Sequence, residues 1–287
     1  MKILVTGATG KIGTDLVDYL TNLRFEIVPI SRHSANSLFS ADLTDNKSVE
    51  RIFAFHKPNL VIHLAGLSNI DYCERNKEAS FLSNVLATEN ISRQCKAHEV
   101  RLIFFSTDYV YGSCNLERKE DDVTIPSTQY GKDKVRAEQI VTSMLSNFVI
   151  FRTAQIYGTR SDYITLVCQA LNSGKVFKAF TNVSNCPTWI GDIRTIISKV
   201  MTSKQSGIFN CAGPKALSRY EFAQNIAKAH SLDTTSIVPS VLHSDLNLRP
   251  KKVALCSERC LNTFGFKPKS FSTVVSLHSN GSISPCR

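Results

Sequence analysis

The chain has no long apolar run and no apolar leader at its start. Its 287 residues contain no stretch of about 18 consecutive apolar residues, the length that a membrane-spanning helix needs. Met1 and Lys2 lead directly into a short apolar segment and a glycine-rich turn, without the apolar core and cleavage-like site of an export signal. We therefore expect no membrane span, no export signal and a cytoplasmic location.

Closely spaced metal ligands are also missing. The nine cysteines are scattered, and Cys256 and Cys260 form the one close pair, without a second pair or flanking histidines to complete a zinc set. No histidine adjoins the acidic loop formed by Glu117, Glu120, Asp121 and Asp122. The sequence predicts buried reduced thiols, a solvated acidic loop and no metal site.

Acidic residues are scarce in the second half of the chain. Residues 151–287 hold 17 Lys/Arg and 6 Asp/Glu, whereas residues 1–150 hold 17 and 18. A basic half indicates a diphosphate-bearing small molecule, a nucleic acid, or simply a solvated positive surface, and charge alone does not choose among them. The basic residues are dispersed and not interleaved with aromatic ones, which disfavours a nucleic-acid partner.

Strand and helix patterns alternate through the first 160 residues. This alternation is typical of a parallel sheet covered by helices on both faces, so the sequence predicts an α/β fold with a Rossmann-type doubly wound parallel sheet. Strands are expected at 2–5, 26–30, 60–64, 102–106 and 148–152, and helices at 12–23, 47–55, 79–98 and 130–144.

The pattern is less regular beyond residue 160. Helices are expected at 163–173, 191–203 and 219–230, and the tail at 276–287 is expected to be flexible. We assign residues 1–160 to an NAD(P)-binding Rossmann domain and residues 161–287 mainly to a smaller C-terminal substrate-binding region. The sequence has no long linker, so the two parts are expected to pack directly, and a homodimer is the assembly that we consider.

A glycine-rich turn follows the first expected strand and opens the first expected helix. Gly7, Gly10 and Gly13 let the backbone turn tightly and let a pyrophosphate approach the helix N–H groups. Lys11 and Ile12 lie within the same turn. In this context the turn predicts a nicotinamide dinucleotide site.

The end of the second expected strand indicates which nicotinamide cofactor is preferred. An acidic residue there would bind the ribose 2′-hydroxyl of NAD, but the segment after Ile30 contains Ser31 and Arg32 and no carboxylate. Arg32 is suited to bind a 2′-phosphate and Ser31 to donate a hydrogen bond to it. We expect NADP to be preferred, with NAD as an alternative if Arg32 is only an exposed loop cation.

Three polar residues form a candidate catalytic set. Tyr130 and Lys134 lie four positions apart on an expected helix, so their side chains share one face. A nearby ammonium lowers the pKa of a phenol and can also bind a cofactor ribose. Thr107 ends the strand expected at 102–106 and can supply a hydroxyl to a substrate carbonyl. Joined to the glycine turn, these residues predict an oxidoreductase.

The same residues belong to a longer series of motifs that covers about residues 1–265. The series comprises Gly7, Gly10, Gly13, Asp42-Leu43, His63–Ala65, Ser106–Gly112, Tyr130-Gly131, Lys134, Arg152-Thr153, Ile156–Gly158, Pro187-Thr188 and Arg249-Pro250. It resembles the extended short-chain dehydrogenase/reductases and, within them, most closely the dTDP-4-dehydrorhamnose reductase family.

The resemblance implies a role for each matching residue. Tyr130 would donate the proton, and Thr107 would polarise the carbonyl. Lys134 would lower the pKa of Tyr130 and anchor the cofactor ribose. The cofactor would further be held by Asp42 and Leu43 at the adenine and by Ala65 and Gly66 near the ribose. Asp108 and Tyr109 would face the sugar, and Arg249 would meet the nucleotide diphosphate.

The chain departs from the family pattern at two positions. Asp133 stands where the family usually has Ser or Thr, and Gln155 stands where these reductases usually have a Trp that contacts the sugar. We therefore include Gln155 among the candidate substrate residues. Trp189 is either an anchor of the core or a wall of the sugar pocket, whereas His63, inside an apolar strand, is expected to be a core histidine.

The residue after Asp108 helps to choose among the reactions of this family. Sugar dehydratases of this family have a glutamate there as a base, and Tyr109 lacks a comparably low pKa. The leading hypothesis is NADPH-dependent reduction of a nucleotide-linked 4-keto-6-deoxy sugar, with a proton from Tyr130. The alternatives are a nucleotide-sugar epimerase and a non-catalytic NADP-binding subunit that resembles the beta subunit of methionine adenosyltransferase.

Overall fold

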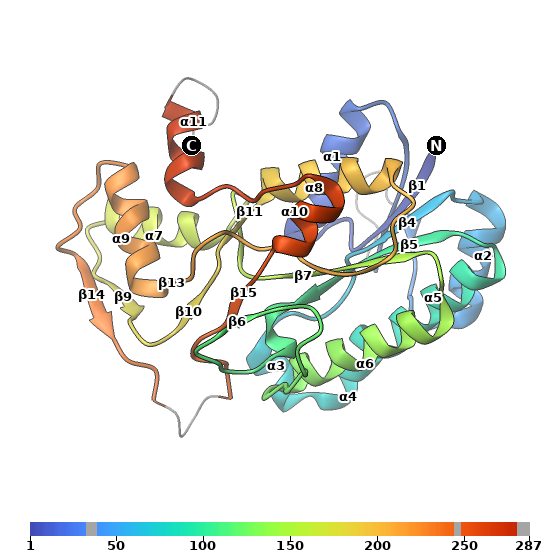
Figure 1. Cartoon of the computed structure of the whole chain (residues 1–287), viewed down its shortest axis with the longest axis horizontal. Helices are drawn as coiled ribbons and strands as arrows, with labels where there is room; N and C mark the ends of the chain where they lie inside the picture. The colour runs from blue at the N-terminus through green and yellow to red at the C-terminus, as the bar shows by residue number, and fades with distance from the viewer. Residues whose placement is uncertain (33–38, 244–247, 280–287) are drawn as a thin grey trace.

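The computed structural model describes residues 1–32, 39–243 and 248–279. Its central sheet has seven strands in the order β12-β7-β5-β4-β1-β2-β3 (Figure 1). In that order they are Gly207–Asn210, Phe148–Thr153, Arg101–Thr107, Leu60–His63, Lys2–Thr6, Glu26–Ser31 and Phe39–Ser40. Every neighbouring pair is parallel, so the carboxyl ends of the strands lie at one edge of the sheet.

Helices cover both faces of this sheet. On one face, α1 (Lys11–Asn22), α8 (Ile190–Thr202) and α10 (Glu258–Phe264) enclose a core that includes Ile3 and Val5 of β1. On the other face, α2 (Asn46–His56), α5 (Ala87–Ala97) and α6 (Gln129–Met144) enclose a second core that includes Leu4. Alternate residues of β1 thus face opposite cores, as the two-residue period of a strand requires. The predicted doubly wound fold is confirmed.

A smaller region lies beside the carboxyl edge of the sheet (Figure 1). Its own core is enclosed by α7 (Tyr163–Asn172), α9 (Arg219–Ala229), α11 (Phe271–Ser279) and the paired strands β9 (Phe177–Phe180) and β14 (Ile237–Ser240). Three further strand pairs lie near the junction with the main sheet: β8 (Ile156–Tyr157) with β11 (Thr188–Trp189), β10 (Ser184–Asn185) with β13 (Leu217–Ser218), and β6 (Glu117–Arg118) with β15 (Ala254–Leu255).

The chain passes between the two parts more than once. Helix α8, strand β12 and helix α10 all follow residue 160 in the sequence, yet they pack with the central sheet. Helix α11 extends to Ser279, so the first residues of the tail expected to be flexible are helical, and residues 280–287 lie outside the described part. The sequence did not predict α3 (Ile70–Arg75), α10 or α11.

The helix expected at 79–98 consists of three segments. Helix α4 (Lys77–Phe81) is followed by a π-helical turn, η1 (Leu82–Leu86), and then by α5. The extra residue of a π-turn frees a backbone carbonyl. Here the Thr88 hydroxyl donates to the carbonyl oxygen of Asn84 at 2.7 Å. Periodicity alone reads these segments as one helix because their apolar faces continue through the turn.

The sequence analysis made one prediction about the thiols and one about membrane-spanning helices. All eight described cysteines are free thiols and six of them are buried, while Cys286 lies outside the described residues. Within the described ranges, no helix is both long enough and apolar enough to cross a membrane.

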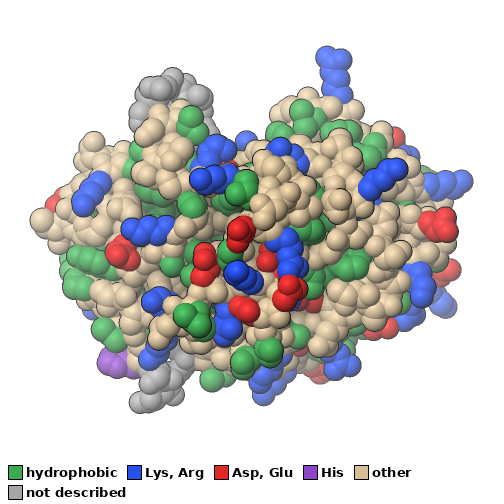
Figure 2. Space-filling view, viewed as in Figure 1, with side chains coloured by type: hydrophobic (Ala, Val, Ile, Leu, Met, Phe, Trp, Pro, Cys, Tyr) green, Lys and Arg blue, Asp and Glu red, His purple; other side chains and the backbone are tan. Residues whose placement is uncertain are grey.

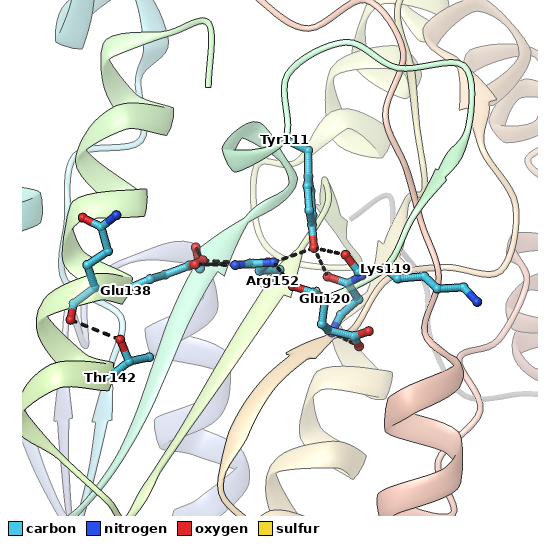
Figure 3. Close-up of polar contacts among 9 residues, drawn as sticks. Tyr111, Lys119, Glu120, Glu138, Thr142 and Arg152 are labelled. Atoms are coloured by element: carbon cyan, nitrogen blue, oxygen red, sulfur yellow. Dashed lines mark hydrogen bonds and ion pairs between the residues drawn. The ribbon is translucent and has the colours of Figure 1, made fainter. Parts of the chain in front are cut away.

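A buried ion pair ties helix α6 to the sheet. Glu138 of α6 and Arg152 of β7 are each 4% exposed, and Arg152 Nη2 lies 2.6 Å from Glu138 Oε2. Arg152 Nη1 donates to the hydroxyl of Tyr111 at 2.6 Å and to the carbonyl of Glu120 at 2.9 Å (Figure 3). The Ser106 hydroxyl of β5 also donates to Glu138. The charges are therefore buried with their hydrogen bonds satisfied, as such a pair requires.

The same network corrects the expectation for the acidic loop. Glu120 is 7% exposed, and its Oε1 accepts a hydrogen bond from the backbone N–H of Asn210 at 2.8 Å. This carboxylate caps the end of β12 and is not solvated. Asp121 instead is exposed and pairs with Arg259.

Glu138→Gln should destabilise the protein by about 3–5 kcal/mol, because it leaves the Arg152 charge buried without its counter-ion. Urea unfolding would measure this loss. The matched control is Glu89→Gln, which removes the exposed ion pair of Glu89 with Arg93 on α5 and should cost less than about 1 kcal/mol. Equal losses in the two variants would contradict a structural role for the buried pair.

Candidate active site

The glycine turn forms a cradle of exposed backbone between β1 and α1. Gly7 has a φ of +67°, and a Cβ there would lie 2.7 Å from the amide nitrogen of Ala65. A Cβ on Gly13 would collide with the carbonyl oxygen of Gly7. The turn therefore needs glycine, and it leaves the first N–H groups of α1 accessible from the cavity. This arrangement fits a pyrophosphate.

A cavity of about 280 Å³ extends from this turn along the end of β2. Ser31, Arg32, Asp42 and Leu43 line it, together with Ala65 and Gly66. Hydrogen bonds from the N–H and hydroxyl of Thr44, at 2.9 and 2.8 Å, lower the pKa of the Asp42 carboxyl, and the nearby Arg32 lowers it further. The residues predicted to hold adenosine and its 2′-phosphate thus share one pocket, while His33 lies outside the described residues.

A larger cavity of about 760 Å³ begins at the same glycine turn and reaches the catalytic candidates. Its wall includes Lys11 and Ile12 at one end and Thr107, Tyr130 and Lys134 further in. Asp108, Tyr109, Gln155 and Arg249 line the remaining wall. A volume of this size is ordinary for a small-molecule site.

Thr107 ends β5 and caps the short 3₁₀ helix η2 (Asp108–Val110). Its hydroxyl donates to Asp108 Oδ1 at 3.1 Å and accepts the backbone N–H of Tyr109 at 3.3 Å. Burial raises the pKa of Asp108 to about 6, against the lowering effects of Thr107 and Arg219. The hydroxyl is thereby held at the carboxyl edge of the sheet, where parallel sheets bind ligands.

Tyr130 projects from the first turn of α6, behind the N-cap Thr128. Burial raises the pKa of its phenol above the ordinary value, and a hydrogen bond with Thr107 opposes that rise. Its ring contacts that of Tyr109 edge to face, with centroids 6.0 Å apart. A half-buried phenol with a raised pKa keeps its proton at neutral pH, which suits a proton donor.

Lys134 lies one turn further along α6 and is 5% exposed. Its ammonium donates to the carbonyl of Phe105 at 2.6 Å and lies 3.9 Å from the centroid of the Phe104 ring. Burial lowers the pKa of Lys134 to about 7, while Glu138 raises it. The sequence argument had this lysine lower the pKa of Tyr130, whereas in the structure burial raises that pKa and the hydrogen bond with Thr107 is what lowers it.

Several cavity residues were missed by the sequence analysis. Arg219 at the start of α9, Asn84 of the π-turn and Asn185 of β10 all line the large cavity. The side chain of Asn84 bonds both the N–H and the carbonyl of Leu67, at 3.0 and 3.1 Å, and so fixes the loop after β4. Each residue is remote in sequence from the glycine turn and the Tyr-Lys pair, so no local motif indicated them.

Three other residues lie away from the cavity. Trp189 is not among its lining residues; its ring packs against Gly158 and Gly191, and the ammonium of Lys269 lies 5.3 Å from the ring centroid. His63 is fully buried between the hydroxyls of Thr6 and Thr88, so the prediction of a core histidine is confirmed. Asp133 accepts hydrogen bonds from Ser80 and Gln129. In the described ranges no cluster of His, Cys, Asp or Glu is placed to hold a metal ion.

The comparisons with known proteins agree with this geometry. The family model described as the RmlD substrate binding domain matches residues 1–280, so the chain belongs to that family. It is an extended short-chain dehydrogenase/reductase, as the sequence resemblance predicted.

Similar proteins include two that are named as reductases and one that is named as an enzyme subunit. The chain is 29% identical over 270 residues to the probable low-salt glycan biosynthesis reductase Agl14 of Haloferax volcanii, covering 89% of each chain. It is 28% identical over 257 residues to the dTDP-4-keto-6-deoxy-D-glucose reductase of Streptomyces niveus, covering 88% of this chain and 87% of that one. It is 25% identical over 249 residues to the methionine adenosyltransferase 2 subunit beta of Bos taurus, covering 83% and 75%.

Solved structures share the whole fold. A dTDP-4-dehydrorhamnose reductase of Clostridium acetobutylicum superposes with a TM-score of 0.89 at 25% identity, covering 98% of this chain and 99% of that one. The dTDP-4-dehydrorhamnose reductase of Bacillus anthracis, solved in complex with NADP, gives 0.88 at 20% identity over 98% and 99%. The second likeness, at this low identity, shows the fold alone.

The lowered pKa of Lys134 predicts how cofactor binding depends on pH. The ammonium loses its proton as the pH rises through about 7, and a neutral amine is the weaker hydrogen-bond donor. The dissociation constant of NADPH should therefore increase about fivefold between roughly pH 6.5 and pH 8.5. Nicotinamide fluorescence would measure it. Lys134→Met should bind weakly throughout and show no such increase; a parallel pH dependence in this variant would assign the effect to another group.

Proposed function

We propose that this protein is an NADPH-dependent reductase of a nucleotide-linked 4-keto-6-deoxy sugar. The observation that carries the proposal is the single cavity that joins the glycine turn to Thr107, Tyr130 and Lys134. A cofactor held by that turn and a ketone held by Thr107 and Tyr130 would share this one cavity. The two relatives with reductase names support the same reaction class.

The chain's own residues would perform the reduction in distinct roles. Bound NADPH supplies the hydride. The Thr107 hydroxyl and the Tyr130 phenol would both contact the carbonyl oxygen, and Tyr130 would transfer its proton to that oxygen. Because burial keeps the phenol protonated, the donor is in the required state before the ketone arrives. Lys134 would anchor the cofactor ribose.

The two parts of the chain would divide the ligands between them. Residues 1–160 would bind the cofactor, and Arg219 and Arg249, both from the region at 161–287, would face the substrate. The homodimer and the cytoplasmic location stay proposals; light scattering of the purified protein would test the first.

Tyr130→Phe should lower the rate of NADPH oxidation with a nucleotide-linked 4-keto-6-deoxy sugar by a factor of roughly 10²–10⁴, because the transition state loses its proton donor. The assay follows nicotinamide absorbance. An epimerase would show no net consumption of NADPH. Tyr72→Phe, which removes an exposed hydroxyl from α3, is a suitable control. Undiminished turnover in Tyr130→Phe would end the assignment of Tyr130 as proton donor.

Arg32→Ala should weaken the binding of NADPH about tenfold and that of NADH less than about twofold, because only the former carries a phosphate for the guanidinium to bind. Titration of both cofactors would measure the two ratios. Equal losses for the two cofactors would remove the argument for NADP.

The binding-subunit alternative has one specific observation in its favour, the similarity to the methionine adenosyltransferase 2 subunit beta. It predicts cofactor binding without turnover on a panel of nucleotide-linked keto sugars, together with a co-purifying partner protein. The retained set of Thr107, Tyr130 and Lys134 at the cavity favours catalysis, because a scaffold has no physical need for a proton donor there.

A further inference from the structure

Arg219 brings a cation into the large cavity from the smaller region. It is the first residue of α9, directly after the N-cap Ser218. The Ser218 hydroxyl accepts the N–H of Glu221 at 3.0 Å, and the Glu221 carboxylate accepts the N–H of Ser218 at 2.7 Å. This reciprocal cap fixes the first turn of the helix, so the backbone of Arg219 is held in a defined place.

The position is unfavourable for a cation in two ways. The positive end of the helix dipole repels it, and the cavity wall removes much of its hydration. Burial accordingly lowers the pKa of the Arg219 guanidinium. Its guanidinium carbon lies 5.2 Å from the centroid of the Tyr163 ring, and electrostatic interaction with Tyr109, Tyr163 and Asp108 opposes the lowering of its pKa. No carboxylate in the described ranges lies within ion-pair distance of Arg219.

Arg249, on the same cavity wall, differs from Arg219. Its Nη2 donates to Asp71 Oδ2 at 2.8 Å, so a protein carboxylate already compensates its charge. Both arginines influence the pKa of Tyr109, which places this tyrosine near each of them. The substrate end of the cavity thus holds one arginine with an ion-pair partner and one without.

The neighbouring wall is polar as well. Asn185 lines the cavity from β10, which pairs with the strand that ends just before Arg219. Gln155 lines it too, and its buried Oε1 has no hydrogen-bond partner within the described structure. The Gln155 oxygen can accept a hydrogen bond from a ligand hydroxyl, and the Arg219 guanidinium, which has no ion pair in the described ranges, can donate to a ligand oxyanion.

We propose that Arg219 is a second anion-binding residue of the substrate site, which receives an oxyanion of the nucleotide-linked sugar in addition to any contact made by Arg249. This inference rests on the proposed function for the identity of the ligand. The oxyanion comes either from the diphosphate or from a carboxylate on the sugar, because a guanidinium binds both through the same pair of parallel hydrogen bonds.

The test is calorimetric titration of the NADP-loaded protein, which does not require turnover. The ligands are a nucleoside, its diphosphate, the corresponding diphosphoglucose and the corresponding diphosphoglucuronate. Arg219→Met keeps the apolar stem but removes the charge. We expect it to weaken the diphosphate-bearing ligands at least tenfold, and to leave the nucleoside and NADPH unchanged. If only the glucuronate loses affinity, the sugar carboxylate is the source of the oxyanion.

Three further variants keep the test decisive. Arg219→Lys retains a charge without the planar fork and should recover part of the lost affinity. Arg93→Met, on the exposed face of α5, controls for the loss of one positive charge from the whole protein. Arg219→Met should melt at the same temperature as the wild type or higher, because a cation leaves the positive end of a helix. Arg219→Gln serves as the second neutral variant if Arg219→Met does not fold.

Two results would overturn the proposal: ligand affinities in the neutral Arg219 variant that match those of the wild type, or a wild-type protein that binds none of the diphosphate ligands. Arg219-dependent binding without reduction of any keto sugar would instead remove the proposed reductase activity and leave the anion site in place.

Discussion

The buried ion pair between Arg152 and Glu138 is the interaction on which the geometry of the site depends. Tyr130, Lys134 and Glu138 succeed one another at intervals of four residues along α6, so they share one face of the helix. When Glu138 is fixed to β7 and to Ser106 of β5, the other two side chains are brought to the carboxyl edge of the sheet beside Thr107. A pair buried this deeply tolerates little displacement, because any shift would leave a charge without its partner.

Burial also determines the protonation states in the cavity. It raises the pKa of Tyr130 and lowers that of Lys134, so both groups favour their neutral forms more than they would in water. A neutral phenol is the form that donates a proton to a reduced carbonyl. Arg219 and Arg249 line the same cavity. Figure 2 shows basic side chains dispersed over the viewed face, with acidic ones between them, and no continuous basic field. The proposed chemistry uses the arginines that line the cavity.

Much of the fold and the first candidates for the site followed from local patterns. Apolar runs and helical spacing gave the five longer strands and the four longer helices of the first 160 residues within a few positions, and the strand-turn-helix context of Gly7, Gly10 and Gly13 indicated the candidate cofactor cradle. The π-turn at Asn84 was not predicted, because one extra residue changes a hydrogen-bond pattern without changing the apolar period. Glu120 was expected to be solvated. In the structure its carboxylate accepts a hydrogen bond from Asn210 and its carbonyl accepts one from Arg152, and both partners lie on strands that are remote in the sequence.

The sequence by itself determined the class of fold, the glycine turn and the candidate reacting groups Thr107, Tyr130 and Lys134, because each of these was recognised from short local motifs. Only the tertiary structure decided which remote residues complete the cavity. Arg219 and Asn185 reach it through the pairing of β10 with β13, and Trp189 is held away from it by packing on Gly158 and Gly191. Such contacts join segments that are far apart in sequence. They depend on how the smaller region packs against the sheet, and the local spacing of residues does not predict that packing.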